Sequence, residues 1–234
     1  MIKKAMILAA GFGKRIYPLT LEYPKPLLKI GNETLLSNTL KFLKLFGIEQ
    51  VVINVHYLGD QIINYIKKNK FEFIINIVEE KEKILNTGGG VLNAINFFSK
   101  EPFIIINPDT IWNSNYLAEL KLMEKRLSEN KKNKCSLLVV NKKKSFDKNL
   151  NGDFILENNL VHRKKKDNLN LIYTGLQIIR SEAFLNLTSK VFSINKIWDN
   201  LIANEELHGI ESNNDFLHVS TLEIYNKLLK KFKY

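Results

Sequence analysis

Apolar and polar residues follow two different periods along the first half of the chain. Short, almost wholly apolar runs predict buried β-strands, and apolar residues three and four positions apart predict helices between them. Thr34–Phe46 is the clearest helix, because its leucines share one face and Gly47 follows as a C-terminal cap. The strands expected here are Ala5–Ala10, Gln50–Val55, Phe71–Val78 and Phe103–Ile106, and the other helices are Asp60–Lys67 and Val91–Phe98, the last opened by Gly88-Gly89-Gly90. Strands separated by helices indicate a mostly parallel, doubly wound sheet.

The pattern changes after the helix expected at Tyr116–Ser128 and the strand at Cys135–Val140. Shorter apolar runs, closely spaced, predict a small antiparallel extension of the sheet. Its expected elements are strands at Gly152–Leu156, Leu160–Arg163, Leu171–Ile179 and Phe216–Val219 and helices at Glu182–Leu187, Lys196–Asn204 and Leu222–Phe232. The sequence therefore predicts a Rossmann-like α/β fold with a doubly wound mixed sheet. We expect one domain over residues 1–234, in which the turn at Asn141–Asn151 separates a first half (1–140) from a second (141–234).

Composition places the chain among ordinary globular proteins, with 45% hydrophobic and 25% charged residues. Its one cysteine, Cys135, excludes a disulfide framework within the chain and fits a reducing compartment. The apolar run near the N-terminus ends at Gly11, which is too short for a signal peptide followed by a cleavage site. No segment approaches membrane-spanning length. We therefore expect a cytoplasmic protein without a membrane partner.

The formal net charge of +11 raises the question of nucleic-acid binding. Only four of the 35 basic residues are arginines, and the lysines are spread along the chain. The densest clusters fall where loops are expected, at Lys131–Lys134, Lys142–Lys144 and Arg163–Lys166. This distribution favours a solvated surface that attracts anionic substrates over a specific nucleic-acid groove.

A glycine-spaced, doubly basic segment follows the first expected strand. Leu8 and Ala10 end an apolar run, Gly11 and Gly13 allow the backbone to approach an anion, and Lys14, Arg15 and Lys25 supply positive charge. The segment lacks the third glycine of the dinucleotide fingerprint and the Gly-Lys-Ser/Thr of a P-loop. Taken alone, the two glycines indicate either a phosphate-binding loop or a tight strand-to-helix turn with surface charges.

The longer string decides between these interpretations. Leu8-Ala9-Ala10-Gly11-x-Gly13-x-Arg15-x-x-Pro18-Leu19-Thr20 and then Pro24-Lys25-Pro26-Leu27 resembles the signature of the sugar-1-phosphate nucleotidyltransferases. The resemblance implies a nucleotide-diphospho-sugar transferase fold, with a nucleoside triphosphate and a sugar 1-phosphate as substrates and Mg²⁺ or Mn²⁺ as the cofactor. It implies catalytic roles for Arg15, Lys25 and Asp109. The nucleotide-binding residues that it implies are Leu8, Ala10, Gly11, Gly13, Lys14, Arg15, Lys25, Thr87 and Gly88.

Asp109 stands after the apolar Phe103–Ile106 strand, in the sequence Asn107-Pro108-Asp109. A carboxylate at the end of a buried strand is well placed for a divalent cation, because nucleotide phosphates supply the other oxygens that Mg²⁺ needs. The alternative from the residues alone is a helix cap. The resemblance implies the metal role for Asp109 and a sugar-orienting role for Asn107, although Pro108 replaces the usual glycine.

The three glycines at 88–90 resemble the family segment that passes the nucleobase, where small residues leave room for a flat ring; a flexible turn is the alternative. In the second half, Gly152-Asp153-Phe154 and Tyr173-Thr174-Gly175 match segments that line the sugar site. The resemblance thus implies substrate-binding roles for Asp153, Thr174 and Gly175. From its residue type, Asp153 is equally well explained as a turn residue.

His218 is a departure from the family pattern. The family carries a second metal-binding Asp near this point, and the chain reads Phe216-Leu217-His218-Val219-Ser220-Thr221. Imidazole binds metals, but Mg²⁺ prefers oxygen. His218 therefore has several interpretations. It ligates a softer ion such as Mn²⁺, or Asp109 and phosphates hold Mg²⁺ without it, or the enzyme is weakened. A purely structural histidine is a further alternative.

Within the family, the short length and the Thr87-Gly88-Gly89-Gly90 segment most resemble uridylyltransferases that act on N-acetylmuramate 1-phosphate. Guanylyltransferases for mannose or heptose 1-phosphate are close alternatives, as is a homologue that binds nucleotide or sugar with weakened catalysis. The resemblance to the N-acetylmuramate 1-phosphate uridylyltransferases implies a role in nucleotide-sugar biosynthesis for the cell wall, as part of peptidoglycan recycling. We expect a monomer or a homodimer.

Overall fold

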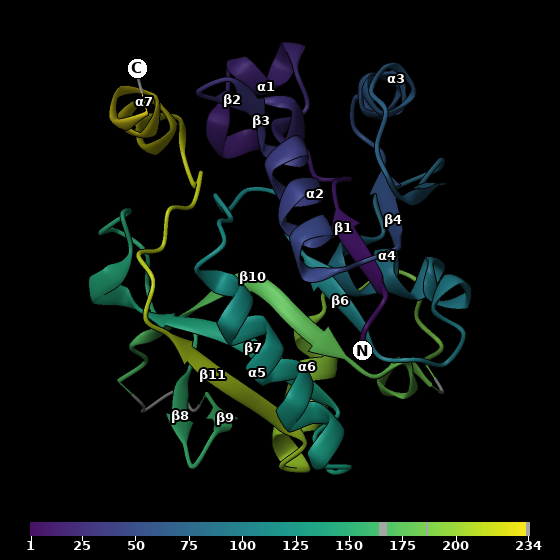
Figure 1. Ribbon diagram of the computed structural model, residues 1–234, viewed down its shortest axis with the longest axis vertical. Helices are drawn as coiled ribbons and strands as arrows, with labels where there is room; N and C mark the ends of the chain where they lie inside the picture. The colour runs from purple at the N-terminus through teal and green to yellow at the C-terminus, as the bar shows by residue number, and fades with distance from the viewer. Residues whose placement is uncertain (164–167, 186, 233–234) are drawn as a thin grey trace.

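A nine-stranded mixed sheet forms the centre of the computed structural model, which describes residues 1–163, 168–185 and 187–232. Its strand order is β5-β4-β1-β6-β10-β7-β11-β9-β8 (Figure 1). The sheet passes through both halves of the chain, which confirms the expected mixed α/β fold. The lysines of the 164–166 cluster lie outside the described residues.

The first four strands in this order are parallel to one another, as the helices expected between them indicated. β1 (Lys4–Leu8) pairs with β4 (Gln50–Val55) on one side and with β6 (Phe103–Ile106) on the other, and β5 (Ile74–Glu79) completes this edge. All four residues of β6 are fully buried, because helices cover both faces. The carboxyl ends of these strands therefore meet along one edge of the sheet.

The second half contributes the mixed part of the sheet. β10 (Leu171–Ile179) runs antiparallel between β6 and β7 (Cys135–Asn141). β11 (Leu207–Ser212) then pairs parallel with β7, and the β8 (Ile155–Glu157) and β9 (Leu160–His162) hairpin closes the edge. The expected antiparallel strands thus continue the sheet, with the longest of them inserted at its middle.

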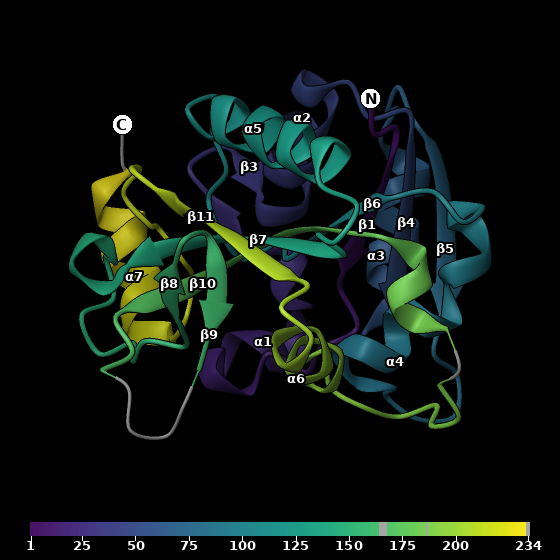
Figure 2. The ribbon, with the colours of Figure 1, turned by 90° about the horizontal axis from the view of Figure 1, so that it is seen from below.

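Two layers of helices cover the sheet (Figure 2). The first core joins α2 (Leu35–Phe46), α3 (Gly59–Lys68) and α5 (Tyr116–Glu129) to one face. The second core joins α4 (Asn86–Asn93) and α6 (Asn195–Ala203) to the other. No helix in the three described ranges is long and apolar enough to cross a membrane.

Local sequence explains the ends of the best-defined helices. The Thr34 hydroxyl accepts a hydrogen bond from the Ser37 amide at 3.0 Å and caps α2, and Gly47 ends it with φ of 98°. Thr221 caps the C-terminal helix α7 (Leu222–Lys231) through the Ile224 amide at 3.3 Å. α7 packs against the segment after β1, together with α1 (Leu19–Glu22) and the β2 (Lys29–Ile30) and β3 (Glu33–Thr34) pair.

Two of the expected helices differ from those observed. Gly88-Gly89-Gly90 lie inside α4, which begins at Asn86, and a 3₁₀ turn at Ile95–Phe98 replaces its expected second half. Ser181–Phe184 is another 3₁₀ turn in place of the helix expected at Glu182–Leu187. Further 3₁₀ turns lie at Lys14–Ile16, Lys25–Leu27 and Lys142–Lys144.

The strand expected at Phe216–Val219 is also wrong. Leu207–Ser212 is the strand in this region, and its interior Gly209 and its polar residues His208, Glu211 and Ser212 hid the signal. Residues 216–220 form isolated bridges, Thr110 to His218 and Ser145 to Phe216. This segment crosses the carboxyl edge of the sheet and thereby reaches the loop after β6.

Candidate active site

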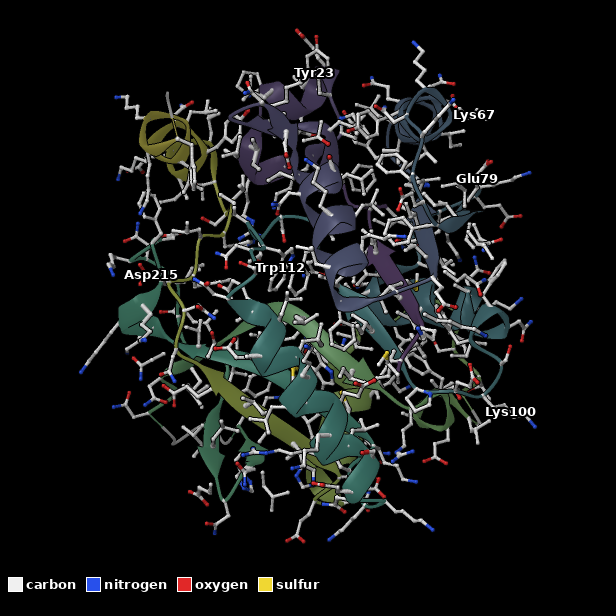
Figure 3. All side chains as sticks on the ribbon, viewed as in Figure 1. Tyr23, Lys67, Glu79, Lys100, Trp112 and Asp215 are labelled. Carbon is white, nitrogen blue, oxygen red and sulfur yellow. The ribbon has the colours of Figure 1, made fainter. Side chains whose placement is uncertain are left out.

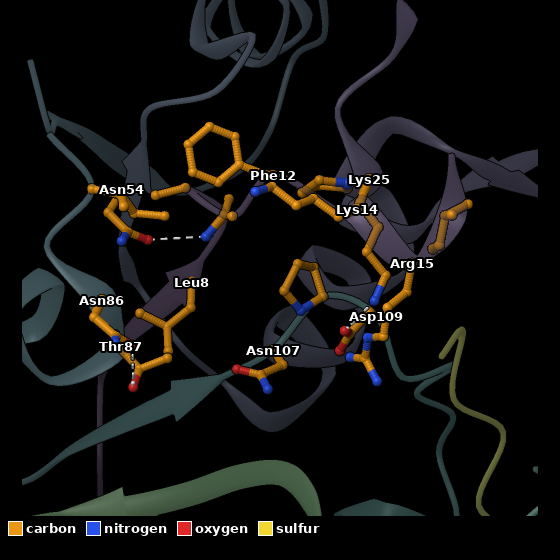
Figure 4. Close-up of a pocket in the computed structure, with 18 of the residues that line it drawn as sticks. Leu8, Phe12, Lys14, Arg15, Lys25, Asn54, Asn86, Thr87, Asn107 and Asp109 are labelled. Atoms are coloured by element: carbon orange, nitrogen blue, oxygen red, sulfur yellow. Dashed lines mark hydrogen bonds and ion pairs between the residues drawn. The ribbon is translucent and has the colours of Figure 1, made fainter. Parts of the chain in front are cut away.

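A cavity of about 460 Å³ opens at the carboxyl ends of β1, β4, β5 and β6. Figure 4 shows Lys14, Arg15, Lys25 and Asp109 on one side of it, and Asn54, Asn86 and Thr87 on the other. The lining residues are Leu8, Ala9, Ala10, Gly11, Phe12, Gly13, Lys14, Arg15, Ile16, Lys25, Pro26, Asn54, Glu80, Ile84, Asn86, Thr87, Asn107, Pro108, Asp109 and Ser220. The structure therefore brings the signature segment, Thr87, Asn107 and Asp109 to one cavity.

The two glycines of the signature segment differ in what they require. Gly13 has φ of 65°, and a Cβ there would lie 3.0 Å from Cγ2 of Thr20, whose hydroxyl donates to the Gly13 carbonyl at 2.9 Å. Gly13 is thus needed for the turn itself. A Cβ on Gly11 would meet no atom within 4 Å, so the space beside Gly11 is open.

Lys25 and His218 converge on one carboxylate. The Lys25 Nζ lies 2.5 Å from Oδ2 of Asp109, and Nε2 of His218 lies 3.1 Å from the same oxygen. Burial by itself raises the pKa of Asp109, but the Lys25 ammonium and the His218 imidazole together hold this pKa well below its usual range. Asp109 is therefore an anion at neutral pH, with a cationic side chain against it.

The C-terminal segment positions His218. The Val219 amide donates to the Asp109 carbonyl at 2.8 Å, and the Ile111 amide donates to the Leu217 carbonyl at 2.9 Å. On its other side, the Ser220 hydroxyl donates to Oδ2 of the buried Asp147 at 2.5 Å. Residues 216–220 thus lie between the Asp109 loop and the loop after β7, and His218 is fixed beside the carboxylate.

Asn107 and Asp109 lie on the loop after β6, which is held in place by hydrogen bonds from the buried side of the cavity. The Trp112 indole donates to the Asn107 carbonyl at 3.1 Å, and Trp112 and Asn38 exchange two hydrogen bonds of 2.8 and 2.9 Å. Figure 3 shows Trp112 in the interior, whereas Lys67 and Lys100 extend from the periphery. The loop is therefore held by a buried aromatic residue, which fixes the backbone beside the catalytic candidates.

The far side of the cavity carries polar residues that the sequence did not reveal as candidates. Oδ1 of Asn54 accepts from the Ala9 amide at 2.9 Å, and its Nδ2 donates to Oε1 of the buried Glu80 at 2.7 Å. Oε2 of Glu80 accepts from the Leu85 amide at 2.7 Å. A polar residue near the end of the apolar β4 strand was the one available signal for Asn54.

The glycines at 88–90 have a role other than making room for a flat ring. A Cβ on Gly88 would overlap the Phe192 ring, and one on Gly89 would overlap the Lys190 carbonyl. The amides of both glycines donate to the Phe192 carbonyl, at 2.9 and 3.0 Å, and Thr87 Oγ1 accepts from the Ile194 amide at 2.9 Å. Gly88 and Gly89 thus let residues 190–194 pack on α4, whereas Gly90 leaves space for Asn54 and Glu80. Of residues 87–90, Thr87 alone lines the cavity.

Asp153, Thr174 and Gly175 do not line the cavity. The Thr174 hydroxyl is buried and donates to the Leu138 carbonyl at 2.8 Å. Gly175 has φ of 92°, and a Cβ there would lie 2.9 Å from Cβ of Asn107, so this glycine leaves space for Asn107. Oδ2 of Asp153 accepts from the Tyr173 amide at 2.9 Å. Of the three, Gly175 alone contacts a cavity residue directly.

The residues around Asp109 fit a divalent cation that completes its coordination with phosphate oxygens. Oδ1 of Asp109 is buried and has no hydrogen-bond partner, and neither has Nδ1 of His218. No cluster of three or more His, Cys, Asp or Glu side chains is found in the described ranges. Because Mg²⁺ and its relatives need only one or two protein ligands when phosphates are bound, this small donor set suffices.

Comparison with known proteins agrees with this arrangement. The family described as nucleotidyl transferase matches residues 4–147, which hold the signature segment, Thr87 and Asp109. The solved structure of HddC from Yersinia pseudotuberculosis in complex with GMP-PN superposes with a TM-score of 0.77. It covers 99% of this chain and 100% of that one at 21% identity, which establishes the shared fold.

Two curated relatives are informative. The chain is 28% identical over 222 residues to an N-acetylmuramate alpha-1-phosphate uridylyltransferase of Caulobacter vibrioides, covering 93% of this chain and 91% of that protein. It is 35% identical over 112 residues to mannose-1-phosphate guanylyltransferase 1 of Arabidopsis thaliana, covering 46% of this chain and 31% of that protein. The chain therefore belongs to the nucleotidyl transferase family, among the enzymes that act on sugar 1-phosphates.

Proposed function

We propose that this enzyme joins UTP to N-acetylmuramate 1-phosphate and releases pyrophosphate. The observation that carries the proposal is the Lys25–Asp109 pair beside the glycine segment in one cavity. In the reaction, an oxygen of the sugar phosphate attacks the α-phosphorus, a new P–O bond forms there and the bond to pyrophosphate breaks. Such chemistry needs positioning and charge neutralisation more than a covalent nucleophile.

Each candidate residue has a proposed task. Arg15 stabilises the leaving pyrophosphate, and Lys25 contacts the phosphates of the nucleotide or of the sugar phosphate. Asp109 and His218 hold the divalent cation, which when bound neutralises charge on the reacting phosphate oxygens. Asn107 orients the sugar. The remaining nucleotide contacts are proposed for Leu8, Ala10, Gly11, Gly13, Lys14 and Thr87, which line the cavity.

The identity of the substrates rests on the relatives. The Caulobacter vibrioides uridylyltransferase matches nearly the whole chain, which favours UTP and N-acetylmuramate 1-phosphate. The second candidate is a guanylyltransferase for mannose or heptose 1-phosphate, favoured by the shorter match to the Arabidopsis thaliana protein. In either case the sugar is proposed to bind beside Asn107, for which Gly175 leaves space. The enzyme is proposed to work in the cytoplasm, as a monomer or a homodimer.

The test is a pyrophosphate-release screen of the four nucleoside triphosphates against a panel of sugar 1-phosphates, with Mg²⁺ and with Mn²⁺. UTP with N-acetylmuramate 1-phosphate is expected to give the highest kcat/KM. Higher values with GTP and mannose or heptose 1-phosphate would replace the first candidate by the second. Triphosphate binding without pyrophosphate release for any pair would indicate a homologue that has lost catalysis.

Lys25→Ala is expected to lower kcat by about 10² or more, because it removes a preorganised charge from the phosphate site. The matched control is Lys67→Ala, at an exposed lysine on α3 (Figure 3). Far-ultraviolet circular dichroism checks that both variants are folded. A folded Lys25→Ala enzyme with normal turnover would remove Lys25 from the proposed machinery.

A further inference from the structure

The pairing of Asp109 with His218 has a consequence for which cation this enzyme uses. We propose that His218 is a direct metal ligand and that the site selects Mn²⁺ over Mg²⁺; this inference rests on the proposed function of the same site. Sequence alone left open whether His218 ligates a softer ion, is bypassed by Mg²⁺, or is structural. The geometry favours the first.

The first observation is the spacing of the two donors. Nε2 of His218 lies 3.1 Å from Oδ2 of Asp109. Two ligands at neighbouring corners of an octahedral ion with bonds of about 2.1 Å lie about 3 Å apart. The imidazole nitrogen and the carboxylate therefore already have a separation at which one ion can bind both.

The second observation is that the carboxylate has an unused oxygen. Oδ1 of Asp109 is buried without a hydrogen-bond partner. A buried polar atom without a partner is unfavourable by about 1–3 kcal/mol unless something binds it. Lys25 and His218 both contact Oδ2, so Oδ1 remains available to a cation.

The third observation is that the ring of His218 is fixed. It stacks on the Phe216 ring with centroids 5.4 Å apart and planes within 11°. The backbone on both sides of it is bonded to the Asp109 loop, through Val219 and Leu217. A donor held in this way presents one nitrogen to the carboxylate and does not swing to solvent, as a preorganised ligand requires.

The nature of the donors then sets the preference. Mg²⁺ takes oxygen ligands almost exclusively, whereas Mn²⁺ accepts carboxylate oxygen and imidazole nitrogen together. A site with one carboxylate and one imidazole is therefore better matched to Mn²⁺. We expect Mn²⁺ to bind about tenfold or more tightly than Mg²⁺, and His218→Asp to reduce this ratio by about tenfold.

The experiment is electron spin-echo envelope modulation of Mn²⁺ bound to the full chain, alone and with the α,β-methylene analogue of UTP or of GTP. A directly coordinated imidazole gives ¹⁴N modulation, which a histidine that merely hydrogen-bonds Asp109 does not. The modulation is expected in the wild-type protein and in His162→Gln, at a histidine on the β8–β9 hairpin. It should be absent in His218→Asp. Uniform ¹⁵N labelling of the protein distinguishes its nitrogens from those of the nucleotide. His218→Gln is the second variant if His218→Asp does not fold.

Free Mn²⁺ counted by its electron paramagnetic resonance signal, with Mg²⁺ as competitor, gives the ratio of the two dissociation constants. Wild-type protein that binds no Mn²⁺, binds it without ¹⁴N modulation, or keeps the modulation in folded His218→Asp would overturn the inference. A ratio of the two dissociation constants that is unchanged in His218→Asp would also overturn it. Modulation from His218 in a protein that releases pyrophosphate with no sugar 1-phosphate would leave the inference standing and reject the proposed function.

Discussion

Lys25 and Asp109, 84 residues apart in the sequence, meet through a contact of 2.5 Å between Nζ and Oδ2. The contact joins the segment after β1 to the loop after β6, two neighbouring strands of the parallel sheet. Both side chains are less than one-fifth exposed, at 14% and 19%. The pair therefore contributes to folding as well as to the charge of the cavity, and the two contributions can be separated by pH.

Lys25→Met is expected to lower the free energy of unfolding by about 1–3 kcal/mol at pH 7. The Lys25 ammonium opposes the rise in the pKa of Asp109 that burial causes, more strongly than any other group. Without it, the buried carboxylate is less stable as an anion. In the wild-type protein the pKa of Asp109 is depressed, so the ionised carboxylate stabilises the fold above the pKa of an unfolded Asp, near ~4. This contribution is lost only as pH falls through the lower folded value. In the variant Asp109 takes up its proton at higher pH, and the stability difference shrinks as pH is lowered from 7 towards 4.

Urea unfolding at several pH values measures this difference. Lys134→Met is the matched control, because Lys134 pairs with Glu182 through a 2.5 Å contact at the surface, where the two side chains are 27% and 46% exposed. The Lys134→Met substitution should change the free energy of unfolding by less than about 1 kcal/mol. A Lys25→Met effect that does not change with pH would contradict this account of Asp109.

Gly11→Ala and Gly13→Ala make the same chemical change with opposite expected outcomes. Alanine at Gly13 must adopt φ of 65°, which is unfavourable by about 1–2 kcal/mol, and its Cβ presses on Thr20. Alanine at Gly11 meets no protein atom, so stability should stay within about 0.5 kcal/mol of the wild type. Its methyl group occupies the space proposed for the nucleotide, and affinity for the bound triphosphate should fall about tenfold or more.

Thermal unfolding and isothermal titration calorimetry with UTP and with GTP distinguish the two glycines. Normal affinity in Gly11→Ala, for whichever triphosphate the wild-type protein binds, would show that the open space beside Gly11 is not used by the nucleotide.

The fold was largely accessible from the sequence where periodicity is strong. Gln50–Val55, Phe103–Ile106 and Leu171–Ile179 have the bounds expected from their apolar runs. β11 was missed because Gly209 interrupts its pattern and its side chains alternate poorly. The position of β10 between β6 and β7 depends on long-range pairing, which a local pattern does not contain.

The candidate site likewise has residues that the local sequence reveals and residues that only long-range contacts reveal. Gly13, Lys25 and Asp109 stand in short motifs at strand ends, so the strand topology alone brings them to one edge. Asn54, Glu80 and Ser220 carry no motif, and their place in the cavity follows from hydrogen bonds between segments distant in sequence. Gly88 and Gly89 mark close packing against residues 190–194, and Gly90 marks the close approach of Asn54 and Glu80. Neither contact can be read from the glycines themselves.

Gly89→Ala tests that packing through the sign of its effect. Gly89 lies inside α4, where replacing glycine by alanine normally stabilises a helix by about 0.5–1 kcal/mol. Here the added Cβ overlaps the Lys190 carbonyl, a backbone atom that cannot move aside alone, so we expect destabilisation of about 1–3 kcal/mol. Urea unfolding measures it, with Gly11→Ala as the control at an open position. A stabilised Gly89→Ala variant would show that residues 190–194 do not pack on α4 in solution.

Ser220→Ala tests whether Asp147 fixes the segment that carries His218. The substitution removes the 2.5 Å hydrogen bond to Oδ2 of Asp147, a carboxylate that is only 4% exposed and keeps the Asn149 amide at 3.0 Å as its other partner. Losing a donor to a buried carboxylate should lower the free energy of unfolding by about 1–3 kcal/mol. Because Ser220 follows His218 by two residues, affinity for Mn²⁺ should fall as well, by about tenfold.

Ser145→Ala is the matched control for this prediction. Ser145 is also buried and its hydroxyl donates to the Asp147 backbone carbonyl at 2.8 Å, so its loss leaves both carboxylate contacts of Asp147 in place. It should lower stability by about 1 kcal/mol and leave Mn²⁺ affinity unchanged. Urea unfolding and Mn²⁺ titration of both variants give the comparison. Equal Mn²⁺ affinities in the two variants would mean that Asp147 stabilises the loop after β7 without positioning His218.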